Sequence, residues 1–200
     1  MSRAFRAWAL FSAWGFVGLC YSIGALWAER AGVTVQVYQT WLDDATPFWV
    51  DGWLVYASFF VLVPYAFFSS ASRWIRPLRL SMQYAALAAL VMYLLWPSSM
   101  VYPEVVGETL NQRLWLWLHE WDTTGNCLPS LHVVLATLCG LALGQSHQGK
   151  RRLIELLWVA LVIVSVLLLK RHLWLDVASG LALALVAAKG GGLWGRRDSI

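Results

Sequence analysis

The sequence predicts an all-α polytopic membrane protein: a bundle of six transmembrane helices, with one amphipathic helix at the membrane interface in an outer connection. Hydrophobic residues make up 60% of the 200 residues and charged residues only 13%, about half the charged share of a soluble domain. The charges also separate long uncharged stretches, and about 20 apolar residues in a helix cross the hydrocarbon core of a bilayer. Because no linker and no repeat divides the chain, we expect one domain over residues 1–200.

Six stretches are predicted to span the membrane. Four of them are clear, at residues 7–28, 53–70, 80–96 and 130–145. The other two are less clean, because the stretch 153–169 carries Glu155 near one end and the stretch 172–188 carries Asp176 near the other. The first apolar run is longer than the core of a signal peptide and lacks a good small-residue cleavage site, so we expect a retained helix, with a cleaved signal as the alternative.

Lysine and arginine predict the orientation of the bundle. With a cytoplasmic N-terminus, six spans place both termini inside, and eleven of the fifteen Lys and Arg residues then lie inside and four outside. The positive-inside rule favours this topology. It also accounts for the net charge of +4, so no nucleic-acid partner is needed. We expect an integral protein of a bacterial inner membrane, with cytoplasmic termini; the oligomeric state stays open.

The longest outer loop, residues 97–129, is expected to contain a helix of its own. Within it, the segment 108–121 repeats large apolar side chains at helical spacing: Leu110, Leu114, Trp117 and Trp121. This pattern predicts an amphipathic helix at the interface, with its indoles at headgroup depth. A lid packed on the bundle is the alternative, and the sequence does not separate the two.

A first candidate site leads into the fourth clear span, in the segment Asn126-Cys-Leu-Pro-Ser-Leu-His132. Pro129 suits the first position of a helix, Ser130 supplies a hydroxyl, and His132 falls in the first turn. A helix N-terminus offers free N–H groups and a partial positive charge, which favour an anion such as phosphate, and a histidine there is placed to act as acid or base. A proline–serine helix start with a chance histidine is the alternative.

A second candidate site opens the last span. His172 and Asp176 are four residues apart, so they are expected on one helical face, and an ionisable residue in a membrane span indicates function. A carboxylate bonded to one ring nitrogen leaves the other nitrogen free to attack. Lys170 and Arg171 just before the pair are able to hold an oxyanion, although a structural pair with snorkelling cations is the alternative. Because both sites lie on the outer side, we expect one pocket there.

At these residues the sequence resembles the type 2 phosphatidic acid phosphatase family, also called the haloperoxidase-like acid phosphatases. The segment Asp122…Asn126-Cys-Leu-Pro-Ser-Leu-His132-Val matches one family motif, and Ser165…Lys170-Arg-His172-x-x-x-Asp176-Val-x-x-Gly180 matches the next. The PSLH form of the first motif is closer to a branch that includes inositol phosphorylceramide synthase-like proteins. The resemblance covers about residues 96–180, which we expect to be the catalytic core.

The resemblance implies roles for these residues. His172 would be the nucleophile that forms a phosphohistidine, with Asp176 orienting it, and His132 would protonate the leaving oxygen and then activate water. The non-bridging phosphate oxygens would be bound by the two cations of the second motif and by two residues of the first: Lys170, Arg171, Ser130 and the backbone of Leu131. The resemblance implies neither a metal nor another cofactor.

The chain departs from the family pattern in two places. The upstream motif of a lysine followed seven residues later by Arg-Pro is missing from the outer loops, because the pair Arg76-Pro77 lacks the lysine and is expected in the cytoplasm. Arg113 is a candidate for the missing contact, with a solvated loop cation as the alternative. Val166 stands where many relatives place a phosphate-binding arginine, which leaves more of that role to Lys170.

The expected activity is therefore hydrolysis of a lipid phosphomonoester or pyrophosphate, presented to a periplasmic active site by the bilayer. A transferase that passes the group to an alcohol would use the same covalent intermediate and stays open. A transporter or another non-enzymatic membrane protein is the third hypothesis, but transporters usually show repeats and broken helices near the midplane, which this sequence lacks.

Overall fold

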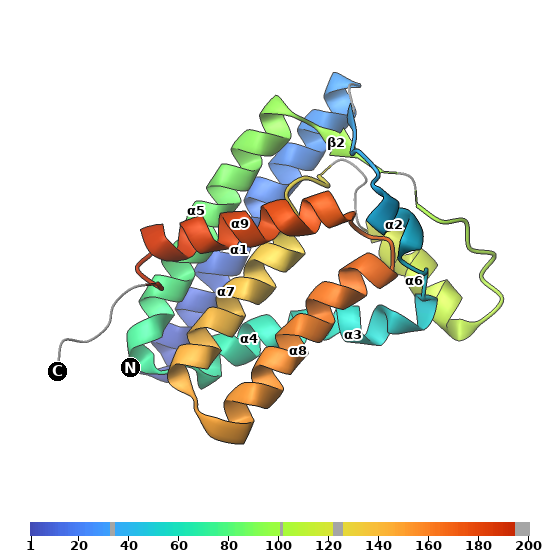
Figure 1. The fold of residues 1–200 in the computed structure, drawn as a ribbon. Helices are drawn as coiled ribbons and strands as arrows, with labels where there is room; N and C mark the ends of the chain where they lie inside the picture. Colours follow the sequence, from blue (N-terminus) through green and yellow to red (C-terminus); the bar gives the residue numbers. More distant parts are fainter. Residues whose placement is uncertain (33–34, 101, 122–125, 195–200) are drawn as a thin grey trace.

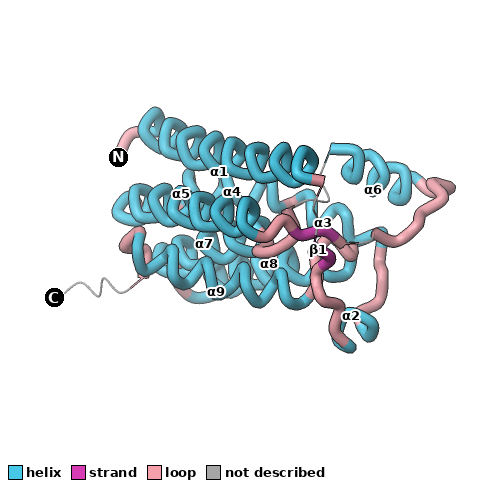
Figure 2. The backbone as a smooth tube through the Cα atoms, turned by 90° about the horizontal axis from the view of Figure 1, so that it is seen from above, coloured by secondary structure: helices cyan, strands magenta, loops and turns pink. Residues whose placement is uncertain are grey.

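The computed structural model describes residues 1–32, 35–100, 102–121 and 126–194. Long helices form one bundle, and the short elements gather at one of its ends (Figures 1 and 2). The long helices are α1 (Arg3–Ala31), α4 (Phe59–Ser69), α5 (Ser72–Leu95), α7 (Leu131–Ser146), α8 (Gly149–Leu168) and α9 (Trp174–Gly190). The start of α1 and the end of α9 lie at the end of the bundle opposite to the short elements.

The helices are apolar on both their inner and outer faces. Side chains such as Phe67 and Leu138 are fully buried in a core that runs through the bundle. On the outer surface, Phe11, Leu95 and Val186 are 73%, 76% and 70% exposed. Helices that are apolar all round are typical of a core surrounded by lipid rather than by water.

Within the described part of the chain, three helical stretches are long and apolar enough to cross a membrane: Arg3–Ala31, Val50–Ser69 and Ser72–Leu95. Helix α7 is apolar but has only 16 residues. The all-α prediction is thus confirmed with three candidate spans, whereas the full set of six stays a prediction.

The predicted start of one long helix was wrong. Helix α5 begins at Ser72 rather than at residue 80, because arginine side chains at a helix end reach polar surroundings while the backbone stays helical. The stretch predicted over 53–70 is helical, with a single turn residue, Ser58, between α3 (Trp53–Ala57) and α4. The Ser58 hydroxyl donates to the carbonyl of Val55 over 2.5 Å, a local bond that competes with helical hydrogen bonding.

The short elements join segments that are distant in sequence. Strand β1 (Val35–Gln36) pairs in parallel with β2 (Ser98–Ser99), and Ser98 also bridges to Asn126. The remaining short elements are α2 (Trp41–Ala45) and the 3-10 turn η1 (Val50–Gly52). Strands of two residues leave no alternating pattern in a sequence, so they were not predicted. They join the loops beside the start of α7.

Helix α6 (Leu110–Trp121) occupies the segment where an amphipathic helix was predicted. Trp115 is 2% exposed and packs with Tyr56 and Val166, while Leu110 and Trp117 are 71% and 55% exposed. One face of α6 thus rests on the bundle, and the predicted apolar face points outward. Both alternatives posed by the sequence describe part of this arrangement.

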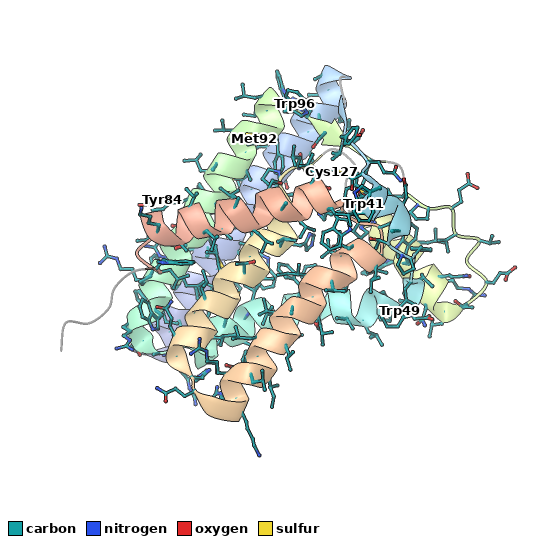
Figure 3. The ribbon with its side chains drawn as sticks, viewed as in Figure 1. Trp41, Trp49, Tyr84, Met92, Trp96 and Cys127 are labelled. Atoms are coloured by element: carbon teal, nitrogen blue, oxygen red, sulfur yellow. The ribbon has the colours of Figure 1, made fainter. Side chains whose placement is uncertain are left out.

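Exposed tryptophans surround the end of the bundle that carries the loops. Trp41, Trp49 and Trp96, labelled in Figure 3, are 75%, 49% and 54% exposed. Indole side chains prefer the boundary between hydrocarbon and water. Trp8 and Trp194, near the opposite end, are 51% and 53% exposed, so the tryptophans fit a membrane interface at each end of the bundle.

Candidate active site

The pair of His172 and Asp176 forms at the start of α9 rather than along one of its faces. The prediction that the helix begins at His172 was wrong: α9 begins at Trp174, with Leu173 as the N-cap. Oδ2 of Asp176 accepts the backbone N–H of Leu173 over 2.9 Å and contacts Nδ1 of His172 over 3.3 Å. The aspartate turns back to cap the helix, and in doing so it reaches the histidine that precedes it.

The surroundings of this pair favour one tautomer of the histidine. Asp176 is fully buried and His172 is 8% exposed. Because a carboxylate only accepts hydrogen bonds, the contact favours a proton on Nδ1 of His172 and a lone pair on Nε2. The second oxygen of Asp176 has no hydrogen-bond partner among the described residues. A neutral histidine held in this way is able to attack an electrophile through Nε2.

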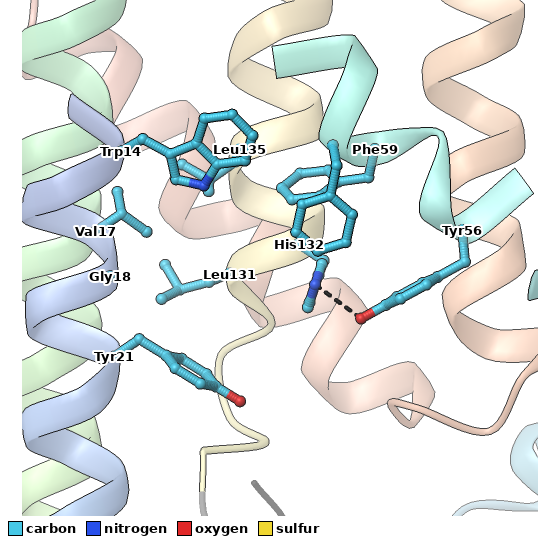
Figure 4. Close-up of a pocket in the computed structure, with 10 residues that line it drawn as sticks. Trp14, Val17, Gly18, Tyr21, Tyr56, Phe59, Leu131, His132 and Leu135 are labelled. Atoms are coloured by element: carbon cyan, nitrogen blue, oxygen red, sulfur yellow. Dashed lines mark hydrogen bonds between the residues drawn. The ribbon is translucent and has the colours of Figure 1, made fainter. Parts of the chain in front are cut away.

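His132 lies in the first turn of α7. The hydroxyl of Ser130 caps this helix by accepting the N–H of Val133 over 3.4 Å, so the helix starts at Leu131. The prediction that Pro129 takes the first helical position was therefore wrong, because Pro129 precedes the cap. Nε2 of His132 lies 2.9 Å from the hydroxyl of Tyr56 (Figure 4).

Close packing of α7 against α9 brings the two histidines together. Their ring centroids lie 6.1 Å apart. The N–H of Ser130 donates to the carbonyl of Asp176 over 3.2 Å, and a Cβ built on Gly180 would lie 2.8 Å from the carbonyl oxygen of Ser130. Only a glycine at position 180 permits this approach without a shift of backbone, which gives a physical reason for the last position of the second motif.

A small cavity lies between the two histidines, and Arg171 and Leu131 also line it. Arg171 is 3% exposed, and its guanidinium carbon lies 4.6 Å from the ring centroid of Tyr102, which lines the same cavity. A guanidinium over an aromatic face is stabilised by the ring quadrupole. The cavity therefore combines two histidines with a cation that is held in place by a residue of the long outer loop.

The other predicted phosphate ligands lie elsewhere. Lys170 has a positive φ of 51°, and its ammonium donates to the carbonyl of Asp43 over 2.5 Å. Arg113 is exposed on α6, where Nε donates to the carbonyl of Gly107 over 3.1 Å. Within the described part of the chain, the residues that line the cavity include neither of these cations, nor Ser130.

Asp43 on α2 supports the site, and sequence reasoning missed it. Its Oδ1 accepts the backbone N–H of Trp174 over 2.8 Å, and its Oδ2 accepts the hydroxyl of Thr40 over 2.6 Å. Burial raises the pKa of Asp43, but the bonds from Thr40 and Trp174 and the nearby charge of Lys170 outweigh it and lower the pKa below its ordinary value. The spacing Thr40-x-x-Asp43, a capping-box pattern, was the available signal.

An apolar groove adjoins the cavity (Figure 4). It encloses about 250 Å³. Its lining comes from α1, α3, α4 and α7, and includes Trp14, Gly18, Tyr56 and Leu135. His132 lines both the groove and the small cavity, so the two spaces meet at this ring. The predicted catalytic core of residues 96–180 did not include α1 or Tyr56; a tyrosine in an apolar run gives no signal of its own.

Within the described residues, no three His, Cys, Asp or Glu side chains gather as a metal site would require. The expectation of metal-free chemistry therefore stays a prediction for a chelator experiment.

The helical bundle and the paired histidines point to the class of phosphatases that use histidine in place of a metal. The chain belongs to the PAP2 superfamily, whose family model matches residues 33–189. Membership of this superfamily indicates phosphatase-type activity on phosphomonoesters, and its enzymes are generally metal-independent. Neither a curated protein nor a solved structure gave a significant match. Helix α1 precedes the matched region, although it supplies one wall of the groove.

Proposed function

We propose that the protein is a membrane lipid phosphatase that hydrolyses a lipid phosphomonoester or pyrophosphate through a phosphohistidine on His172. One observation carries the proposal: His132 lines both the small polar cavity and the apolar groove. The groove suits a hydrocarbon chain, and the two histidines and Arg171 around the small cavity suit a phosphate head, for which the cavity must widen. The bond to be cleaved then lies beside His132.

In the first step, the lone pair on Nε2 of His172 attacks phosphorus and an N–P bond forms. The ester P–O bond breaks, and its electron pair goes to the leaving oxygen, which takes a proton from His132. Reacting atoms in a near-attack complex lie about 3–3.5 Å apart, so a phosphate that lies beside both rings, whose centroids are 6.1 Å apart, is within reach of both. Asp176 stabilises the positive charge that develops on His172.

In the second step, His132 removes a proton from water, and the water oxygen attacks phosphorus. The N–P bond breaks and returns its electron pair to Nε2 of His172, which releases phosphate. The ester and one water thus become an alcohol and phosphate, and both histidines recover their starting state. The hydroxyl of Tyr56 orients His132 during both proton transfers.

Arg171 and the N-terminus of α7 stabilise the negative charge on the transferred phosphoryl group. Arg171 presents a fork of donors that matches phosphate oxygens. The first backbone N–H groups of α7, including that of Leu131, add the partial positive charge of a helix start. Preorganised donors of this kind stabilise the transition state without a metal.

We place the reaction at the outer, periplasmic face. The distribution of lysine and arginine supports a cytoplasmic N-terminus, and the exposed tryptophans near the site fit an interface at that end. The PSLH motif at Pro129–His132 supports a relation to the branch that includes inositol phosphorylceramide synthase-like proteins. In that branch an alcohol rather than water would accept the group.

The test is phosphate release by purified protein in detergent, with chelator present. The substrate panel holds phosphatidate, lysophosphatidate, phosphatidylglycerol phosphate and a polyprenyl pyrophosphate. We expect release that survives the chelator and disappears in the His172→Ala variant, which circular dichroism must show to be folded. Full activity in this variant would refute the phosphohistidine mechanism.

Labelled phosphate distinguishes the hydrolase from the transferase. Label that appears as free phosphate supports hydrolysis. Label that appears only on an added alcohol acceptor would replace the hydrolase with a phosphotransferase that uses the same histidines.

A further inference from the structure

We infer that the apolar groove selects the substrate lipid by chain length: it holds one hydrocarbon chain and is bounded at one end by the stacked rings of Trp14 and Phe60. Gly18 keeps the groove open between these rings and the site. The inference rests on the proposed lipid phosphatase activity and deepens it, because it assigns the part of the substrate that the groove selects.

One end of the groove is polar, and the rings of Trp14 and Phe60 lie at the other end. Tyr21 and His132 line both the groove and the small cavity, so they mark the end where the phosphate lies. Trp14 lies two helical turns away on α1, about 10 Å at 1.5 Å per residue, and Figure 4 shows it at the other end of the groove from Tyr21. The rings of Trp14 and Phe60 stack with centroids 6.2 Å apart and planes at 15°.

Gly18 controls the width of the groove at its middle. It lines the groove between Trp14 and Tyr21, and a Cβ built on it would meet nothing within 4 Å. The space over this glycine is therefore available to a ligand. A leucine at this position would project into the space that we assign to the chain.

The occupant follows from the size and position of the groove. Its volume of about 250 Å³ is below the roughly 300–1,000 Å³ of pockets that bury whole drug-sized ligands, which fits one chain segment. Phe60 is 46% exposed and Gly18 is also exposed, on helical stretches long and apolar enough to span a membrane. The groove thus opens sideways, where a lipid chain can enter from the bilayer.

The energetics predict how the rate depends on chain length. Each methylene transferred from water into the groove contributes about fourfold in affinity. For a phosphate monoester that is monomeric in water, kcat/KM should rise with each methylene until the chain reaches the stacked rings. Further methylenes then add nothing, because they have no place in the groove.

The experiment compares n-alkyl phosphates from butyl to dodecyl, each below its critical micelle concentration, with wild type, Gly18→Leu and Gly15→Leu. Gly15 is the matched control: it lies on α1, a Cβ there also meets nothing within 4 Å, and it does not line the groove. Substrate partitioning into detergent is the same for both variants. Phenyl phosphate, which has no alkyl chain, reports on the catalytic groups alone.

We expect wild type and Gly15→Leu to share one rising curve with a plateau and to hydrolyse phenyl phosphate at the same rate. Gly18→Leu should reach its plateau several methylenes earlier. Identical chain-length profiles for the two leucine variants, with wild type active, would overturn the selection by chain length and leave the phosphatase standing. No phosphate release by folded wild type from any substrate would instead overturn the proposed function.

Discussion

Substitution of Gly180 by alanine tests the packing that sets the distance between the two histidines. The added methyl would lie 2.8 Å from the carbonyl oxygen of Ser130 and 3.2 Å from Cβ of Val133. Ordinary contacts at such sites begin near 3.4 Å. Helices α7 and α9 must therefore separate by about 0.6 Å, because neither the carbonyl nor the branched side chain is able to turn away.

The expected magnitude follows from this displacement. A misplacement of about 1 Å costs roughly 100-fold in rate, so a shift of about 0.6 Å should lower kcat/KM by about tenfold. Overpacking costs about 1–3 kcal/mol of stability, offset by about 1 kcal/mol because alanine favours the helix over glycine. Gly180→Ala should thus remain folded while its activity falls.

The assay measures kcat/KM on phenyl phosphate, together with the melting temperature in detergent. Gly144→Ala on α7 is the matched control, because its added methyl would meet side-chain atoms of Leu156 and Arg152 at ordinary distances of 3.6 and 3.8 Å. We expect this control to keep its activity and to melt at the same or a higher temperature. Wild-type activity in Gly180→Ala would refute the reasoning that this contact fixes the histidine spacing.

Three further predictions concern the surroundings of the site. The pKa of Asp43 is lowered in the folded protein, so its ionised form stabilises the fold at pH values above the unfolded pKa of about 3.9. This stabilisation is lost as pH falls through the folded pKa. Asp43→Asn should therefore melt at a lower temperature than wild type at neutral pH, and the difference in melting temperature should shrink in acid. Tyr56→Phe removes the hydroxyl bonded to His132, so kcat on phenyl phosphate should fall about fivefold, and an unchanged kcat would remove Tyr56 from the mechanism. Tyr102→Leu removes the ring under Arg171 and should raise KM about two- to thirtyfold, whereas Tyr102→Phe keeps the ring and should raise KM less.

The sequence alone was sufficient to select His132 and His172 as candidates, because polar residues at the edge of an apolar run are costly to bury in lipid and therefore indicate a function. It was also sufficient for the spacing of His172 and Asp176, although the pair forms through a helix cap rather than a helical face. Local patterns carry this information because the residues involved are neighbours in the chain.

The features of the site that the sequence did not predict depend on contacts between distant segments. Asp43 bonds to Trp174, which lies 131 positions away in the chain, and no local pattern records such a pairing. The groove draws on α1 because that helix lies beside α4 in the bundle. The turn residue Ser58 was not predicted, because serine is tolerated in many helices and the backbone there stays close to helical.

The positions of Arg171 and Tyr102 give a physical explanation for the missing upstream basic motif of the family. Where relatives draw a cation from an outer loop, this chain places Arg171 next to the proposed nucleophile, and the long outer loop contributes Tyr102 beneath it. The ring of Tyr102 in turn lies 6.4 Å from that of Trp115 on α6, in an edge-on contact. A loop that supports the cation through aromatic rings, instead of supplying the charge itself, makes phosphate binding depend on how α6 rests on the bundle. Displacement of α6 should therefore weaken substrate binding, with no change to either histidine.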